Sequence, residues 1–236
     1  MFSFVSNVTI ADGSNTARWR EPVCPSIIGT APEQGDFIKA RILEIAKSAG
    51  AKVGEAAKCT PNLLVFLTTQ PNELIAQLKA SYPKLFDITA MEEITGVLPT
   101  AQPVRIWQRA TLNNADGTPP GTAYRMKDSR ILSSVAEELA AVIIVVDTAS
   151  TGTVTFGQLS DYISMVALAQ VDLRAELAKS STILRLFAGN SPENTPRELT
   201  DWDRAFLKAV YGLQDSHLRE PSVVTNRMLQ QLDSED

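Results

Sequence analysis

Two uninterrupted apolar runs restrict the fold of this chain more than any other feature of its sequence. They are NLLVFLTT at 62–69 and VIIVVDT at 142–148. Each run is apolar at five consecutive positions and has the length of a strand, which is typical of strands covered on both faces of a sheet. Because helical patterns lie next to both runs, the sequence predicts a sheet with helices packed on it.

Three elements are predicted around the first run. A helix begins at Pro32 and ends before Gly50, and a second helix covers 71–82. Segment 17–29 is extended and interrupted by prolines, which places it at a sheet edge or in a loop.

The segment between the two runs gives a mixed pattern. Residues 88–98 predict a short helix with a capping box at its start. Strand 104–112 alternates between apolar and polar residues, which predicts a half-exposed, antiparallel edge strand. EELAA at 137–141 favours helix, although it leads into the second run without a breaker.

The last third of the chain is predicted to be helical. Helix 156–170 is apolar on two sides, which indicates that most of it is buried. Further helices are expected over 181–189, over 199–213 and over 221–236. In the second of these, Thr200 is the predicted cap and Asp203 reaches back to it as a capping box.

These patterns predict one α+β domain over 1–236, with a mixed sheet and an antiparallel edge strand. Residues 1–16 and 230–236 are expected to be flexible ends.

The composition excludes some classes of partner. The chain has 22 Lys and Arg against 27 Asp and Glu, and its basic residues are scattered. Proteins that bind nucleic acid concentrate Lys and Arg, so no nucleic-acid partner is expected. The longest apolar run is far shorter than the roughly 20 residues needed to cross a membrane, so no membrane span is expected.

The start of the chain and its two cysteines leave alternatives open. MFSFVSNVTI lacks the basic region and long apolar core of a signal peptide. Either the protein is not exported, or this is a mature form with an added Met. Cys24 and Cys59 can form a disulfide, which would stabilise the fold by about 3–4 kcal/mol, or they can be two unrelated buried thiols.

Two carboxylates are candidates for a cleft. Asp147 ends the second apolar run, and the carboxyl ends of strands in open sheets commonly face ligands. Asp161 lies on helix 156–170, and together the two could bind a metal ion or act as acid and base. The simpler interpretation is that Asp147 starts a turn and Asp161 makes a hydrogen bond near the start of its helix.

A second candidate surface is the polar face of strand 104–112. Arg105, Trp107 and Arg109 lie on this face and could bind an extended peptide or an anionic group. A solvated strand face would carry the same residues.

Several stretches that span nearly the whole chain resemble a family of exported bacterial proteins of unknown function. They are RWREPVCPSIIG, the helix after it, CTPNLLVFLTT, PVRIWQ, VIIVVDT, QLSDYISMVALAQVDL, STILRLF and LTDWDRAFLKAVY. The two cysteines of that family look paired, so the resemblance implies a Cys24–Cys59 disulfide. It also implies a periplasmic or secreted location, where disulfides persist.

The order of elements is also similar to that of the catalytic domain of zincin-like metallopeptidases. Their HExxH motif requires two histidines one turn apart, so that both imidazoles meet one zinc ion. In the closest register here these positions are Asp161, Tyr162 and Met165, and the single histidine of the chain is His217. The resemblance therefore implies a zincin-like layout with a relict cleft and no zinc-peptidase chemistry.

Together these inferences predict an exported, non-catalytic envelope protein that binds or scaffolds a protein partner, with no cofactor and no metal. It would use strand 104–112 or the relict cleft near Asp161. The alternative is a metal-assisted hydrolase that uses Asp147 and Asp161.

Overall fold

The structure is a computed structural model. It describes Phe4, Val5, Val8, Leu177 and the ranges 16–55, 58–83, 92–95, 103–114, 135–173, 180–187, 195–213 and 221–233. Its strands are β1 (Arg18–Trp19), β2 (Pro25–Ile28), β3 (Leu63–Thr68), β4 (Glu92–Thr95), β5 (Val104–Asn114) and β6 (Val135–Asp147). Its helices are α2 (Pro32–Ala49), α3 (Pro71–Ser81), α4 (Phe156–Leu168), the 3-10 helix η4 (Ile183–Phe187), α5 (Asp201–Gly212) and α6 (Pro221–Asp233).

The strands form one mixed sheet in the order β2-β3-β6-β5-β4, with β1 also beside β6. β1 and β3 run parallel to β6, and β2 runs parallel to β3. β5 runs antiparallel to β6, and β4 runs antiparallel to β5. The two apolar runs are neighbours, since Leu63 pairs with Val142 and Thr68 with Asp147. These pairings confirm the predicted α+β class.

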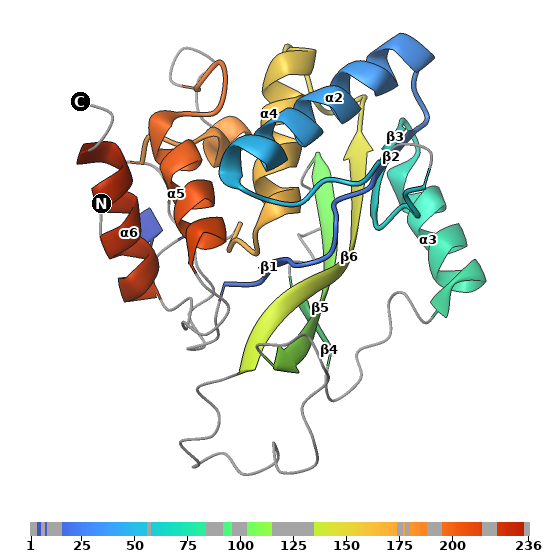
Figure 1. The fold of residues 1–236 in the computed structure, drawn as a ribbon. Helices are drawn as coiled ribbons and strands as arrows, with labels where there is room; N and C mark the ends of the chain where they lie inside the picture. The colour runs from blue at the N-terminus through green and yellow to red at the C-terminus, as the bar shows by residue number, and fades with distance from the viewer. Residues whose placement is uncertain are drawn as a thin grey trace.

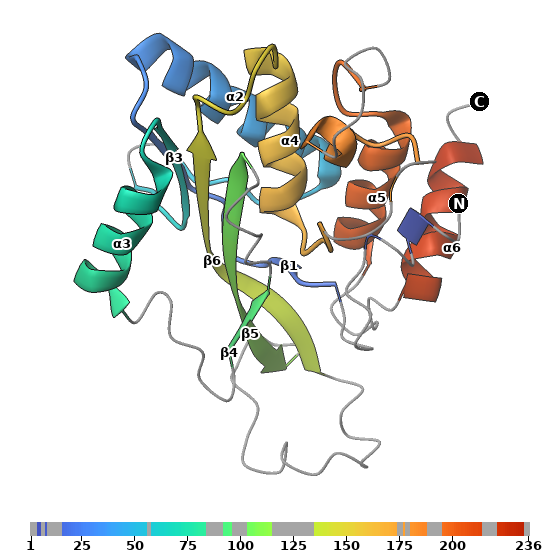
Figure 2. The ribbon, with the colours of Figure 1, turned by 180° about the vertical axis from the view of Figure 1, so that it is seen from behind.

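Helices cover both faces of the sheet. Figures 1 and 2 show α4, α5 and α6 on one side and α3 on the other, while α2 crosses over α4. The larger hydrophobic core lies between the sheet and α2, α4 and α5. A smaller cluster lies under α3 and contains Trp107, Ile143 and Val145.

The ends of α2 agree with the sequence. Pro32 occupies its first turn, where a missing N–H costs nothing. Gly50 ends it in the left-handed conformation at φ 93°, and its N–H bonds to the last turn. Pro25–Ile28 confirms that part of segment 17–29 lies at an edge of the sheet.

One helix prediction is wrong, and one segment with a helix preference lies in a strand. Residues 92–95 form β4, and EELAA at 137–141 lies inside β6, where it pairs with β5. Helix propensities differ by only a few tenths of a kcal/mol per residue, so sheet pairing outweighs them. The remainder of the predicted helix 88–98 lies outside the described residues, as does His217.

One further expectation needs correction. β5 is antiparallel as predicted, but it lies between β6 and β4 and is therefore not the edge strand. Within 1–16, where a flexible end is predicted, the described residues Phe4, Val5 and Val8 are buried. The Phe4 ring lies 5.5 Å from the ring of Trp202, and residues 230–233 continue α6.

Helix α4 is buried along most of its length, which confirms the prediction from its two apolar sides. Ten consecutive residues, from Leu159 to Leu168, are buried. Three side chains donate hydrogen bonds to the carbonyls at its carboxyl end: Gln108 Nε2 to Val166 O (2.7 Å) and Ala169 O (3.2 Å), Trp19 Nε1 to Ala167 O (2.7 Å), and Tyr211 Oη to Leu168 O (2.6 Å). The last carbonyls of a helix have no partner within it, so these bonds allow this end to be buried.

We expect Gln108→Leu to lower the free energy of unfolding by about 2–3 kcal/mol, because it leaves two buried carbonyls without this donor. Tyr211→Phe removes a single hydroxyl from the same helix end and should cost about 1 kcal/mol. Urea unfolding followed by circular dichroism measures both. A Gln108→Leu protein as stable as the wild type would contradict this account.

Asp203 joins the start of α5 to η4. It forms the predicted capping box with Thr200, and its carboxylate also accepts from the Thr182 hydroxyl and from Ile183 N (2.8 Å). The side chain is fully buried. Burial raises the pKa of Asp203 above its usual value, although the hydrogen bonds oppose this shift.

The raised pKa of Asp203 predicts a pH-dependent contribution to stability. A carboxyl whose pKa is higher in the folded state stabilises the fold most below its unfolded value of about 3.9, and this stabilisation is lost as the pH rises through the folded pKa. The difference in unfolding free energy between wild type and Asp203→Asn should therefore widen in favour of the wild type from pH 7 to pH 4. Urea unfolding at pH 4, 5.5 and 7 measures it, and a gap that narrows at low pH would contradict the assignment.

Candidate functional site

Asp161 is a structural anchor that ties α4 to α2. Its carboxylate is 1% exposed and accepts two bonds from Arg41, Nε to Oδ1 at 2.6 Å and Nη2 to Oδ2 at 3.1 Å. It also accepts from Leu199 N at 2.7 Å. The bond to Asp161 raises the pKa of the Arg41 guanidinium, which stays charged. Both carboxylate oxygens are thus engaged within the protein.

Asp147 lies at the end of β6, as predicted, and holds a turn. Its carboxylate accepts from Ala149 N at 3.1 Å and from the Ser150 hydroxyl at 2.8 Å. These are the bonds of an aspartate that starts a turn. The contacts of Asp147 therefore agree with the simpler interpretation of the sequence, in which Asp147 starts a turn.

Tyr162 and Met165 lie inside the core. Tyr162 is 3% exposed, and its ring makes an edge contact with Phe187 at 4.9 Å between centroids. Burial raises the pKa of the Tyr162 phenol. Met165 is fully buried. Asp161, one of the four predicted cleft residues, borders a hollow that it shares with Arg41.

The predicted cleft residues are therefore not brought together around one open site. No group of three or more His, Cys, Asp or Glu side chains in the described part of the chain is placed to hold a metal ion. None of the described helices is both long and apolar enough to cross a bilayer.

The face of β5 that carries Arg105, Trp107 and Arg109 is largely covered. Arg105 and Trp107 are each 6% exposed, so the expected half-exposed face is wrong for these two residues. Trp107 belongs to the cluster under α3, and Arg105 Nη1 donates to Asn72 Oδ1 on that helix at 2.6 Å. Sequence alternation showed two faces but could not show that a helix lies on the second.

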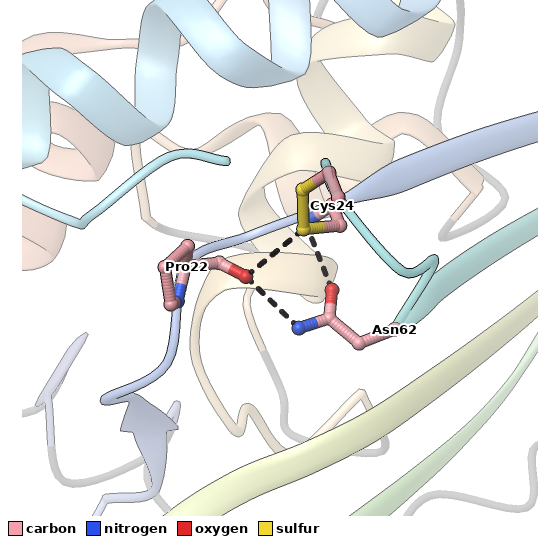
Figure 3. The surroundings of a disulfide bond; sticks show 4 residues. Pro22, Cys24 and Asn62 are labelled. Atoms are coloured by element: carbon pink, nitrogen blue, oxygen red, sulfur yellow. Dashed lines mark hydrogen bonds between the residues drawn. A yellow bond between two sulfur atoms is a disulfide. The ribbon is translucent and has the colours of Figure 1, made fainter. Parts of the chain in front are cut away.

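Cys24 and Cys59 form the predicted disulfide, with their Cα atoms 5.7 Å apart. Figure 3 shows the side chain of Asn62 beside it. Cys24 N donates to Asn62 Oδ1 at 2.8 Å, and Asn62 Nδ2 donates to Pro22 O at 3.0 Å. The covalent bond and this amide both hold the segment before β2 against the start of β3. Gly54 packs on the disulfide, where a Cβ atom would overlap the sulfurs.

A groove of about 360 Å³ lies between β2 and α2, and we call it the β2–α2 groove. Its walls are the strand residues Val23–Ile27, the turn and helix residues Thr30, Ala31, Pro32, Gly35, Asp36, Lys39 and Leu43, and the disulfide segment with Gly54, Cys59 and Pro61. The helix residues recur three or four positions apart, so they form one face of α2. Backbone, apolar and charged groups all border this groove.

No pattern in the sequence predicted the β2–α2 groove. Its one signal is Gly35, a glycine inside a helical pattern, which costs about 1 kcal/mol relative to alanine. A Cβ atom at Gly35 would lie 3.5 Å from Thr30 Cγ2 and 3.7 Å from Ile27 Cβ, which is ordinary contact. The glycine therefore leaves the groove open and is not needed for the backbone.

Comparison with models of protein families, with curated proteins and with solved structures finds no match to this chain. The two resemblances noted in the sequence therefore stay predictions.

The Arg41–Asp161 pair predicts a strong effect on stability. The Asp161 carboxylate is 1% exposed and the Arg41 side chain is 22% exposed. Asp161→Asn removes the charge-assisted bonds between them but leaves Arg41 its ion pair with Glu44, so it should lower the free energy of unfolding by about 1–3 kcal/mol. The double variant Arg41→Met/Asp161→Leu should lose less free energy of unfolding than the sum of the losses in the two single variants, because the two side chains interact directly.

The matched control is Glu198→Gln. Glu198 is 70% exposed and lies 4.0 Å from the Arg41 guanidinium, so its removal should change the unfolding free energy by less than about 0.5 kcal/mol. Urea unfolding of the wild type and the five variants measures these differences. Full additivity of the Arg41 and Asp161 substitutions would contradict the anchor role.

Proposed function

We propose that this chain is a non-catalytic protein of the cell envelope or the secreted fraction that binds a protein partner in the β2–α2 groove. The observation that carries the proposal is the combination of groups around this groove. A sheet edge, a helix face with both charge signs and several apolar side chains border one hollow. Concave sites with a few well-placed polar groups are where proteins most often bind ligands.

The contacts of the two candidate carboxylates give less support to the hydrolase alternative. Asp161 is engaged by Arg41 and Leu199 N, and Asp147 holds its own turn. A carboxylate that acts as a base or a metal ligand must have an oxygen available to the substrate or the ion. The partner-binding proposal needs neither residue.

Two observations support an exported location. The Cys24–Cys59 disulfide is of a kind that persists in oxidising compartments and is rare in the cytosol. The resemblance to exported bacterial proteins implies the same compartment. Both motivate a search for the partner in the envelope and secreted fractions.

Gly35 provides the variant that tests the proposal. Gly35→Phe should fill the β2–α2 groove without a backbone clash, because a Cβ atom fits at this position. We expect the wild type to capture one stoichiometric partner from native envelope fractions and Gly35→Phe to lose it. Affinity purification with quantitative mass spectrometry, followed by reconstitution of the purified pair, measures this.

The matched control is Gly35→Ala. It keeps most of the groove open and should raise the free energy of unfolding by about 0.5–1 kcal/mol, because alanine is the better helix former. It should retain the partner. A partner that binds the Gly35→Phe protein as tightly as the wild type would place the binding site elsewhere and overturn the proposal.

A further inference from the structure

The outer edge of the strand segment that leads into β2 already accepts a neighbouring strand. Val23 N donates to Lys52 O at 2.9 Å, and Gly54 N donates to Val23 O at 3.1 Å. Val23 and Val53 thus form an isolated parallel bridge on the side away from β3. The chain leaves this ladder at Gly54, where it turns toward Cys59.

The ladder has room to continue along β2. Cys24 O accepts from the backbone at the start of β3, so Cys24 faces β3 and Val23 faces outward. Successive residues of a strand alternate in this respect, which turns the backbone groups of Pro25 and Ile27 outward. In the described part of the chain, β3 is the only strand that pairs with β2. Pro25 offers its carbonyl, and Ile27 offers both a carbonyl and an N–H.

From this geometry we propose that the occupant of the β2–α2 groove is an extended segment of the partner protein, which adds to the outer edge of β2 as a further strand. The inference rests on the proposed function and specifies its partner. It commits to a peptide main chain because the outer edge offers directional backbone donors and acceptors, and a peptide in strand conformation matches them at a regular spacing.

Charges on the helix wall define the partner segment further. Asp36 and Lys39 line the groove one helical turn apart, and no ion pair among the described residues involves either of them. Asp36 and Lys39 are three residues apart, a rise of about 4.5 Å along a helix. Two residues that lie on the same face of a strand are about 6.7 Å apart, and long side chains can bridge the difference between these two spacings. A strand with a basic and an acidic residue two positions apart therefore complements this wall.

The side chains between the two charged positions of the partner segment should be apolar. By strand alternation Ile28 points to the sheet face opposite that of Ile27, and Ile28 is 43% exposed. An added strand would place its intervening residues beside Ile28 and cover it. The segment expected here alternates charged residues toward α2 with β-branched or aromatic residues toward Ile28.

The probe for this inference is a displayed library of random decapeptides. It is selected on the oxidised wild-type protein, with the Gly35→Phe protein used to remove peptides that bind elsewhere. We expect the selected peptides to alternate as described, with opposite charges two positions apart. Binding of the synthesised peptide should slow hydrogen exchange of the Ile27 amide at least tenfold.

Two backbone tests separate strand addition from other binding in the groove. N-methylation of alternate peptide nitrogens should weaken binding at least tenfold in one register and little in the other, because only every second N–H of an added strand faces β2. In the protein, Ile27→Pro removes the outward donor, whereas Ile27→Ala removes only the side chain. Ile27→Pro should lose at least tenfold more affinity than Ile27→Ala.

The outcomes distinguish this inference from the proposed function. One outcome is that peptides bind the wild type but not Gly35→Phe, that the Ile27 amide is not protected, and that both N-methyl series weaken binding equally. This outcome would overturn strand addition and leave the groove as the binding site. Peptides that bind both proteins equally, or no enrichment over the Gly35→Phe background, would overturn both. Sedimentation experiments could instead show that the wild type is a dimer and that Ile27→Pro abolishes this dimer. The occupant of the groove would then be a second copy of this chain and not a different protein.

Discussion

The structure depends on hydrogen bonds that allow one helix, α4, to be buried on all sides. An apolar helix enters a core easily, but its terminal carbonyls do not, because an unsatisfied buried carbonyl costs about 1–3 kcal/mol. Here Trp19, Gln108 and Tyr211 supply the missing donors from β1, β5 and α5. Three elements far apart in the sequence are thus fixed around the same helix end.

The Arg41–Asp161 pair extends this arrangement to α2. Arg41 bonds to Asp161 of the buried helix and fixes how α2 lies across it. The face of α2 with Gly35, Asp36 and Lys39 borders β2 and forms one wall of the groove. The position of this wall relative to the sheet edge is therefore set by a contact on another side of the same helix.

Sequence patterns predicted the elements that depend on local periodicity. The two apolar runs, the ends of α2 and the capping box at Thr200 belong to this group, because each signal lies within a few residues of its effect. They failed where a distant segment decides the outcome. EELAA pairs with β5 in spite of its helix preference, and Arg105 is covered by a helix about 30 residues before it. Arg41 carries no local sign of its partner 120 positions away.

The candidate site shows the same division between local and distant information. The sequence placed Asp161 on a helix and gave it two interpretations, chemical and structural, that no local pattern could separate. What bears on the choice is how far the carboxylate is already hydrogen-bonded, and that depends on Arg41 and Leu199 from elsewhere in the chain. The β2 edge differs from Asp161 in this respect. Its outward backbone groups have no strand partner in the described part of the chain beyond Gly54. Groups already engaged in the fold hold the structure together, and groups left at an open edge are the ones that can recognise another chain.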